Sequence, residues 1–230
     1  MGLPLYLALS REEWAGAVRL PPYFGWLGCH FGANGCGIEG LPPEPVPLLI
    51  LDDRIPPREQ DTEEGCAVLQ DLSAEGRFEA LLLDFQRPAL PKSQNLARRL
   101  VQALSCPVGV SADYAASLPC PVFLPPLPLR RSLQTHLRPW AGREIWLDLA
   151  LQQETVTVTE TGAVCQPGCP SIEGPELRDE ALFCHYQTEI LDDRAVFKIR
   201  RSKEDFHSLM EAAEALGVRR AMGLWQELCE

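Results

Sequence analysis

Short apolar runs separated by turn signals or helix-like stretches recur along the whole chain, and this pattern predicts a sheet of mostly parallel strands. We expect strands at residues 3–10, 23–31, 47–51, 78–85, 106–111, 121–124, 144–151, 155–159, 195–199 and 221–228. Amphipathic stretches predict helices at residues 61–74, 93–104 and 203–216. About eight strands in a chain of 230 residues favour an α/β fold, a reduced (β/α)8 TIM-type barrel with some helices shortened or missing. An open doubly wound sheet is the alternative.

The chain is expected to form one domain over residues 1–230, because no linker, internal repeat or low-complexity segment interrupts the pattern. An excursion is expected at about residues 152–180. Residues 155–159 alternate like one half of an exposed hairpin that closes after Gly162. Residues 164–175 are rich in Pro and Gly and predict a loop.

The most informative stretch is the apolar run at residues 78–86, which ends in a carboxylate and a carboxamide. Successive strand side chains point to opposite faces, so Leu82, Asp84 and Gln86 are expected to share one face. A run that is apolar on both faces is typical of a buried parallel strand. Since folds of this kind bind ligands at the carboxyl ends of their strands, Asp84 and Gln86 indicate where a site lies.

The composition of the chain restricts the kinds of partner that the protein is expected to bind. Lys and Arg number 21 against 32 Asp and Glu, a net charge of -11, which repels nucleic acid and anionic membranes on average. No apolar run approaches the ~20 residues of a membrane span, and the N-terminal stretch lacks the basic region of a secretion signal. The nine cysteines are scattered, several within apolar runs, as is typical of reduced thiols. We therefore expect a cytoplasmic protein with no nucleic-acid or membrane partner.

Other chemical motifs are absent or weak. The chain has no Gly-x-Ser-x-Gly elbow, and the glycine-rich residues 32–37 lack the Lys-Ser/Thr of a phosphate-binding loop. Two groups have a spacing that zinc could use, but neither repeats a paired Cys-x-x-Cys pattern. They are Cys165, Cys169 and Cys184-His185, and Cys29-His30 with Cys36. We expect no metal and no cofactor.

Two segments together resemble glycoside hydrolase family 18, especially its small bacterial members that act on spore-cortex or peptidoglycan-like chains. Residues 78–86 resemble the family's strand-four motif Asp-Gly-x-Asp-x-Asp-x-Glu. Residues 195–228 resemble the family's ending, in which a helix and a glycine precede a last strand that carries a sugar-stacking Trp, here Trp225. The resemblance implies the barrel fold and a glycosidase-like site.

Carried over position by position, the first Asp of the motif falls on Glu79, its glycine on Ala80 and its second Asp on Leu82. The third Asp is retained as Asp84, whereas the catalytic glutamic acid falls on Gln86. In the family, that acid protonates the departing glycosidic oxygen, and the third Asp orients the acetamido group that attacks the anomeric carbon. A glutamine amide has no transferable proton near neutral pH, so a general-acid contribution of roughly 10²–10⁴-fold would be lost.

Three hypotheses on function follow from the resemblance. In the first, a catalytically impaired relative binds an N-acetylated glycan, a chitooligosaccharide or a peptidoglycan-like chain, through Asp84, Gln86 and Trp225. In the second, an active glycosidase uses a relocated acid, because glycosidases need two carboxyls at a fixed separation. The carboxylates at other strand ends are Asp52, Asp53, Asp113 and Glu227, and the first three are the candidates for the relocated acid and for substrate contact. In the third, a structural or assembly protein retains a vestigial pocket.

Overall fold

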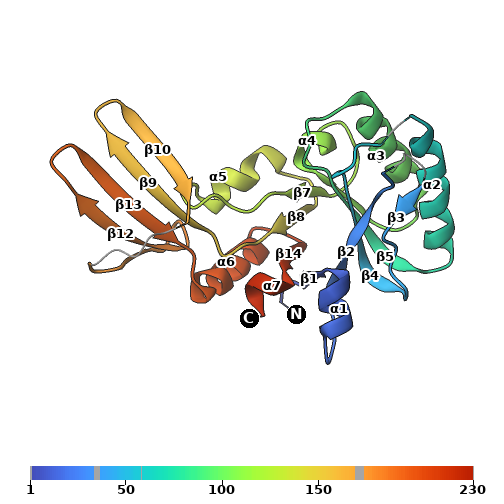
Figure 1. The fold of residues 1–230 in the computed structure, drawn as a ribbon, viewed down its shortest axis with the longest axis horizontal. Coiled ribbons are helices and arrows are strands. Elements are labelled where there is room, and N and C mark those ends of the chain that lie inside the picture. The colour runs from blue at the N-terminus through green and yellow to red at the C-terminus, as the bar shows by residue number, and fades with distance from the viewer. Residues whose placement is uncertain (1, 34–36, 58, 169–173, 230) are drawn as a thin grey trace.

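Eight parallel strands close into a barrel, which forms the body of the molecule (Figure 1). The computed structural model describes residues 2–33, 37–57, 59–168 and 174–229. The barrel strands, in spatial order, are β1 (Leu5–Leu9), β14 (Arg220–Leu224), β8 (Ile145–Asp148), β7 (Val122–Leu124), β6 (Val108–Ser111), β5 (Phe78–Asp84), β4 (Val46–Asp52) and β2 (Phe24–Phe31). β1 also pairs with β2, which closes the ring, and β3 (Ile38–Glu39) is added antiparallel to β2. The predicted barrel is confirmed, and the open sheet is wrong.

The helices around the barrel are mostly short. They are α1 (Arg11–Gly16), α2 (Glu59–Ala74), α3 (Pro91–Ala103), α4 (Ala112–Ala115), α5 (Leu133–Leu137) with a 3₁₀ turn (Arg138–Trp140), α6 (Lys203–Ala215) and α7 (Trp225–Leu228). Among the described residues, only α2, α3 and α6 exceed two turns, so the barrel is reduced as predicted. No helix in the described ranges is long and apolar enough to cross a membrane.

The last strand is shorter than the sequence indicates. We expected a strand over residues 221–228, but β14 ends at Leu224 and Trp225 begins α7. Leu224 pairs with Ala8, and the neighbouring β1 ends one residue later, at Leu9. Residues beyond Leu224 therefore have almost no neighbouring strand to pair with, and the chain turns into a helix instead.

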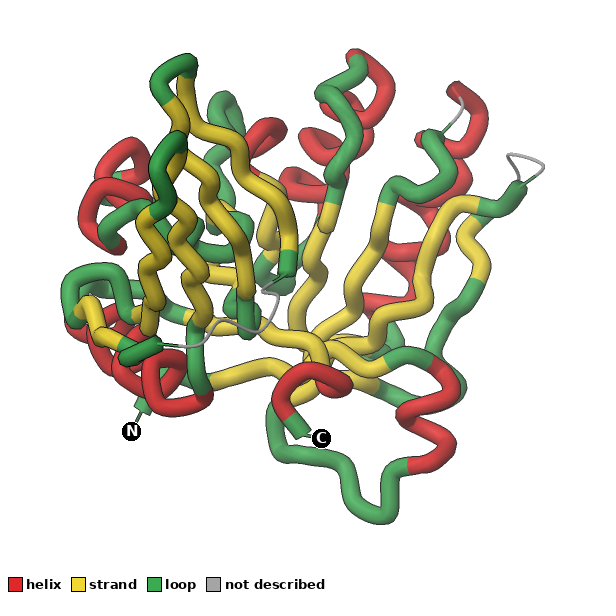
Figure 2. The backbone as a smooth tube through the Cα atoms, turned by 60° about the vertical axis from the view of Figure 1, so that its left-hand side comes forward, coloured by secondary structure: helices red, strands yellow, loops and turns green. Residues whose placement is uncertain are grey.

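A second, antiparallel sheet of five strands is inserted between β8 and α6 and projects from one side of the barrel (Figures 1 and 2). Its strands, in spatial order, are β10 (Gly162–Pro167), β9 (Gln153–Thr159), β13 (Arg194–Arg200), β12 (Cys184–Ile190) and β11 (Leu177–Asp179). The predicted hairpin is the β9–β10 pair. The excursion extends beyond the expected residues 152–180 to Arg200, and part of the expected loop at 164–175 is strand β10.

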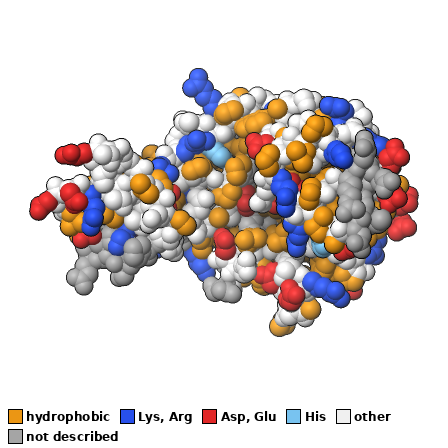
Figure 3. Space-filling view, turned by 45° about the horizontal axis from the view of Figure 1, so that its top comes forward, with side chains coloured by type: hydrophobic (Ala, Val, Ile, Leu, Met, Phe, Trp, Pro, Cys, Tyr) orange, Lys and Arg blue, Asp and Glu red, His pale blue; other side chains and the backbone are white. Residues whose placement is uncertain are grey.

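Acidic side chains gather at the far end of this second sheet (Figure 3). Glu160 lies in the β9–β10 turn, and Asp192 and Asp193 lie in the β12–β13 turn. All three are exposed. The tip of the sheet therefore adds to the negative charge of the protein where it reaches furthest into solvent.

The barrel divides the core into two layers, and strand β5 contributes to both. Ala80 and Leu82 pack inside the barrel, with Phe123 and Trp146 among their neighbours. Leu81, Leu83 and Phe85 instead pack on the outer face, in the layer that includes the helices. The predicted division of residues 78–86 into two faces is confirmed, and Asp84 follows Leu82 on the inner face.

Gly109 on β6 lets the Trp146 ring pack inside the barrel. A Cβ atom at position 109 would lie 2.3 Å from Cε3 of Trp146, whose side chain is fully buried. We expect Gly109→Ala to lower the free energy of unfolding by about 1–3 kcal/mol, because the ring has no room to retreat. Urea denaturation measures the change. Gly16→Ala is the control, since a Cβ there meets nothing within 4 Å. Equal effects of the two changes would contradict the packing argument.

Candidate functional site

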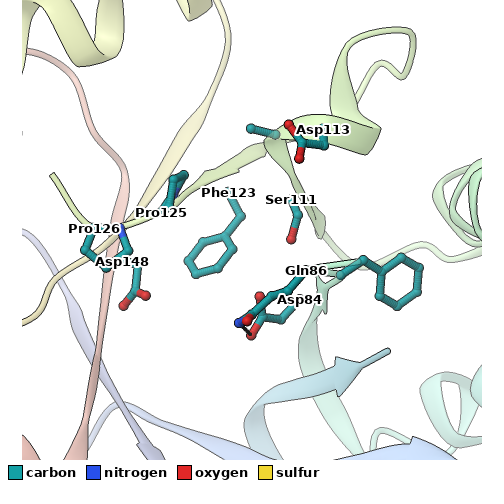
Figure 4. A pocket seen from close by; sticks show the side chains of 10 residues that line it. Asp84, Gln86, Ser111, Asp113, Phe123, Pro125, Pro126 and Asp148 are labelled. Atoms are coloured by element: carbon teal, nitrogen blue, oxygen red, sulfur yellow. Dashed lines mark hydrogen bonds between the residues drawn. The ribbon is translucent and has the colours of Figure 1, made fainter. Parts of the chain in front are cut away.

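A cavity of about 350 Å³ opens at the mouth of the barrel where the strands have their carboxyl ends (Figure 4). Side chains at or just beyond the ends of β5, β6, β7 and β8 form its walls. The lining residues are Asp84, Phe85, Gln86, Ser111, Ala112, Asp113, Phe123, Pro125, Pro126 and Asp148. One wall is apolar, and the lining residues that the structure describes include three carboxyl groups and one amide but no Lys or Arg. A saccharide needs both surfaces, because its rings have apolar faces and polar edges.

Asp84 and Gln86 form a hydrogen-bonded pair in this cavity. The Gln86 Nε2 atom donates to the Asp84 Oδ2 atom at 3.1 Å. Burial raises the pKa of Asp84 to about 6, and the nearby carboxylates Asp52 and Asp53 act in the same direction. The hydrogen bond from Gln86 works against this rise because it favours the charged form. The two residues that the sequence predicts for the centre of the site therefore do meet there.

Asp53 holds the loop that carries Gln86. Its carboxylate accepts the backbone N–H groups of Gln86 at 2.9 Å and Arg87 at 3.1 Å. The Arg87 Nε atom donates to the Asp53 carbonyl oxygen at 2.9 Å. Only 3% of Asp53 is exposed, and it is not among the cavity-lining residues. The structure thus gives Asp53 a positioning contact rather than a place on the cavity wall.

Asp52 ends strand β4 directly beside Asp84 in the barrel register. Its carboxylate accepts hydrogen bonds from Arg54 Nε at 2.9 and 2.8 Å, and from the Arg54 backbone N–H at 3.0 Å. The hydrogen bond to Asp52 also raises the pKa of the Arg54 guanidinium. Asp52 is therefore neutralised by its own loop, and it does not line the cavity.

The other two predicted residues differ in position. Asp113 lies on α4, is exposed, and lines the cavity at its rim. Trp225 is half-buried at the start of α7 and is not among the lining residues. The structure therefore brings Asp84, Gln86 and Asp113 together in one cavity, whereas Asp52, Asp53 and Trp225 lie outside its lining.

Asp148, Phe123 and Ser111 line the cavity without having been predicted as site residues. Asp148 and the Asp84–Gln86 pair lie on opposite sides of the Phe123 ring in Figure 4. The Ser111 hydroxyl donates to the Leu83 carbonyl oxygen at 3.1 Å. We expected a strand over residues 144–151, but β8 ends at Asp148. A carboxylate at the end of a buried strand was the signal that would have found it.

Burial raises the pKa of Asp148 to about 7, and the charges of Asp84 and Glu227 add to this rise. An interaction with the Leu149 backbone N–H acts in the opposite direction. Two carboxyl groups of the cavity thus titrate near neutral pH. Such groups either exchange protons with a ligand or hold a proton to donate in a hydrogen bond.

The two cysteine groups with zinc-like spacing are not assembled into a metal site in the described ranges. No cluster of three or more His, Cys, Asp or Glu there could hold a metal ion. Cys184 is buried with its thiol 3.9 Å from the Leu129 carbonyl oxygen, and His185 contacts Asp205 at 2.7 Å. Cys36 and Cys169 lie outside the described residues. The described cysteines are all free thiols.

Comparison of the whole chain with known proteins gives a result for the fold alone. No protein-family model matches the sequence, and no curated protein does. Solved structures do match, and they show the fold: the chain has a glycoside hydrolase family 18-like barrel fold.

Three of these structures illustrate the likeness. The spore cortex-lytic enzyme SleL of Bacillus megaterium QM B1551 has a TM-score of 0.61 at 11% identity, over 97% of this chain and 70% of that one. A chitinase from Chromobacterium violaceum ATCC 12472 has a TM-score of 0.60 at 10% identity, over 99% and 98%. A Glu-to-Gln mutant of the class V chitinase from Nicotiana tobaccum in complex with NAG4 has a TM-score of 0.63 at 7% identity, over 97% and 93%.

Proposed function

We propose that the protein binds an N-acetylated glycan, a chitooligosaccharide or a peptidoglycan-like chain, in the cavity at the barrel mouth and does not cut it efficiently. The observation that carries this proposal is the Asp84–Gln86 pair, a carboxylate and an amide joined by a hydrogen bond inside the cavity. Together they offer acceptors and donors to sugar hydroxyl and acetamido groups. The amide cannot supply the proton that a departing glycosidic oxygen needs.

The apolar wall supports a saccharide over a smaller polar ligand. Phe123, Pro125 and Pro126 stand together on this wall (Figure 4), and Pro125 is exposed while Pro126 is half-buried. Apolar surfaces of this kind pack against the C–H face of a sugar ring. Fold neighbours give further support, because the tobacco chitinase was crystallised with NAG4 as a Glu-to-Gln mutant. A glutamine in place of a glutamate is therefore compatible with sugar binding in that protein.

Isothermal titration with N-acetylated chitotetraose tests the proposal. We expect binding to the wild-type protein, weaker binding of cellotetraose (which lacks acetamido groups), and no cleavage products by chromatography. Asp84→Ala should weaken binding by about 10- to 100-fold, because a hydrogen bond to a charged group is lost. Asp71→Asn, a change of an exposed carboxylate on α2, should leave the affinity unchanged.

Two results would count against the proposal. If Asp84→Ala binds as the wild type does, the cavity is not the binding site. If no glycan binds at all, the result supports the alternative hypothesis of a structural protein with a vestigial pocket. A Trp225→Ala variant tests the predicted stacking contact separately, because Trp225 lies outside the cavity lining.

A further inference from the structure

Asp148 is a carboxyl group on the cavity wall, and no Lys, Arg or His among the described residues forms an ion pair with it. It ends β8, and Asp84 from β5 and Glu227 from α7 act on it with like charge. The donor that acts on it is the backbone N–H of Leu149, which also donates to the Met222 carbonyl oxygen at 2.8 Å. Within the described ranges, no side chain donates a hydrogen bond to Asp148.

The other charged groups at the barrel mouth do not offset the negative charges around Asp148. Asp84 faces Asp52 and Asp53, so the acidity extends around the mouth towards β4. On that side, the Arg54 guanidinium is engaged by Asp52. On the α7 side, the Oε2 atom of Glu227 is itself buried without a hydrogen-bond partner. Of these groups, Asp84 and Glu227 act directly on Asp148 and disfavour a negative charge there.

The protonated form of Asp148 is consequently the form that the surroundings favour up to about neutral pH, since burial and like charges raise its pKa to about 7. A protonated carboxyl group has one O–H donor in addition to its acceptors. Because the group lines the cavity, this donor is available to a ligand. The opposite wall provides Asp84, which acts as an acceptor once it is ionised.

We propose that Asp148 is a specificity-determining residue of the cavity, whose carboxylic acid donates a hydrogen bond to a neutral acceptor oxygen of the bound saccharide, such as an acetamido carbonyl. This inference rests on the proposed glycan binding. It adds that the site selects N-acetylated sugars over de-N-acetylated sugars, whose ammonium group offers no acceptor at that point. It also adds that ionisation of Asp148 removes the selective contact.

Titration calorimetry with N-acetylated chitotetraose at pH 5.5 and pH 8.5 tests the inference on the full chain. Loss of the proton from Asp148, with a pKa of about 7, should lower wild-type affinity by up to about 30-fold between the two values. Ionisation of Asp84, with a pKa of about 6, improves it as an acceptor over the same range and should offset this fall by at most about 4-fold. Asp148→Asn keeps an N–H donor at every pH, so its affinity should stay near the wild-type value at pH 5.5 and lose most of the pH dependence. Asp148→Leu lacks the donor and should bind about 10-fold more weakly at pH 5.5. Asp71→Asn should follow the wild type.

The thermal midpoint gives a second readout without ligand. Asp148 has a raised pKa in the folded protein, so its contribution to stability is fully present below about pH 4 and is lost as the pH rises to about 7. Asp148→Asn should therefore melt at a higher temperature than the wild type at pH 8.5, and this difference should shrink towards pH 4.

Several outcomes would overturn the inference. It fails if Asp148→Asn keeps the pH dependence of the wild type, or if wild-type affinity rises between pH 5.5 and 8.5. It also fails if the de-N-acetylated chitotetraose binds more tightly than the N-acetylated one, which would indicate a cation site. If the wild type binds glycan and Asp148 has no effect, only this inference is lost. If the wild type binds no glycan at pH 5.5, the proposed function fails and this inference fails with it.

Discussion

Replacing Gln86 by glutamate should raise the rate of chitooligosaccharide hydrolysis by roughly 10²–10⁴-fold over the wild-type protein, the usual contribution of a positioned general acid. The Gln86 side chain already lies in the cavity and donates to Asp84 at 3.1 Å. A carboxyl group of nearly the same size at this position would face Asp84, Asp52 and Asp53, and like charges of this kind favour its protonated form. Hydrolysis of a fluorogenic chitotrioside at about pH 5.5 measures the gain.

Two further variants make this prediction specific. Gln86→Met keeps the length of the side chain but has no proton to transfer, so it should be as inactive as the wild type. The double change Gln86→Glu with Asp84→Asn should lose most of the gain, because Asp84 is the group that would orient the acetamido nucleophile in the family mechanism. If Gln86→Glu binds glycan without cutting it, the missing general acid is not the sole reason that the cavity does not hydrolyse glycans. If the wild type is already active and Asp113→Asn abolishes its activity, the relocated-acid hypothesis is favoured.

Asp53→Ala should lower the free energy of unfolding by about 2–4 kcal/mol and weaken glycan binding as well. The change leaves two backbone N–H groups, those of Gln86 and Arg87, without their acceptors. The loop that carries Gln86 then loses its anchor, although Asp53 itself is not on the cavity wall. Urea denaturation and titration with chitotetraose measure the two effects.

The adjacent aspartate provides the matched control for this prediction. Asp52 pairs with Arg54, whose side chain is 55% exposed, so Asp52→Ala should cost only about 0–1 kcal/mol. Asp53→Asn keeps one acceptor and should lie between the two alanine variants. If Asp53→Ala and Asp52→Ala are equally stable, the anchoring contact does not have the importance we give it.

The periodicity of the sequence predicted the barrel strands and their faces well, because these depend on local alternation and on burial. In residues 78–86, two apolar faces and a polar end were enough to place Asp84 inside the barrel and at its mouth. The length of a strand was less predictable. Where β14 and β8 stop depends on where their neighbours stop, and that is a property of the assembled sheet.

The partners of the site residues could not be predicted for a similar reason. Asp53 is fixed by backbone groups 33 and 34 positions further along the chain, and no local pattern records such contacts. Asp52 and Asp53 are neighbours with the same side chain, yet one meets an arginine two residues away and the other anchors a distant loop. The sequence thus indicated carboxylates near the strand ends, but it missed Asp148 as a site residue, and the different contacts of Asp52 and Asp53 required the structure.

Closure of the barrel has a consequence for how the chain reaches its folded form. The first strand, β1, is paired on one side with β14, so the ring can close only after β14 has been synthesised. Until then β1 has β2 as its single neighbour and an unsatisfied edge. Contacts between positions so far apart in the chain slow folding. The nascent protein therefore has an open, aggregation-prone edge at β1 until β14 pairs with it, and β14 is the strand that leads into Trp225.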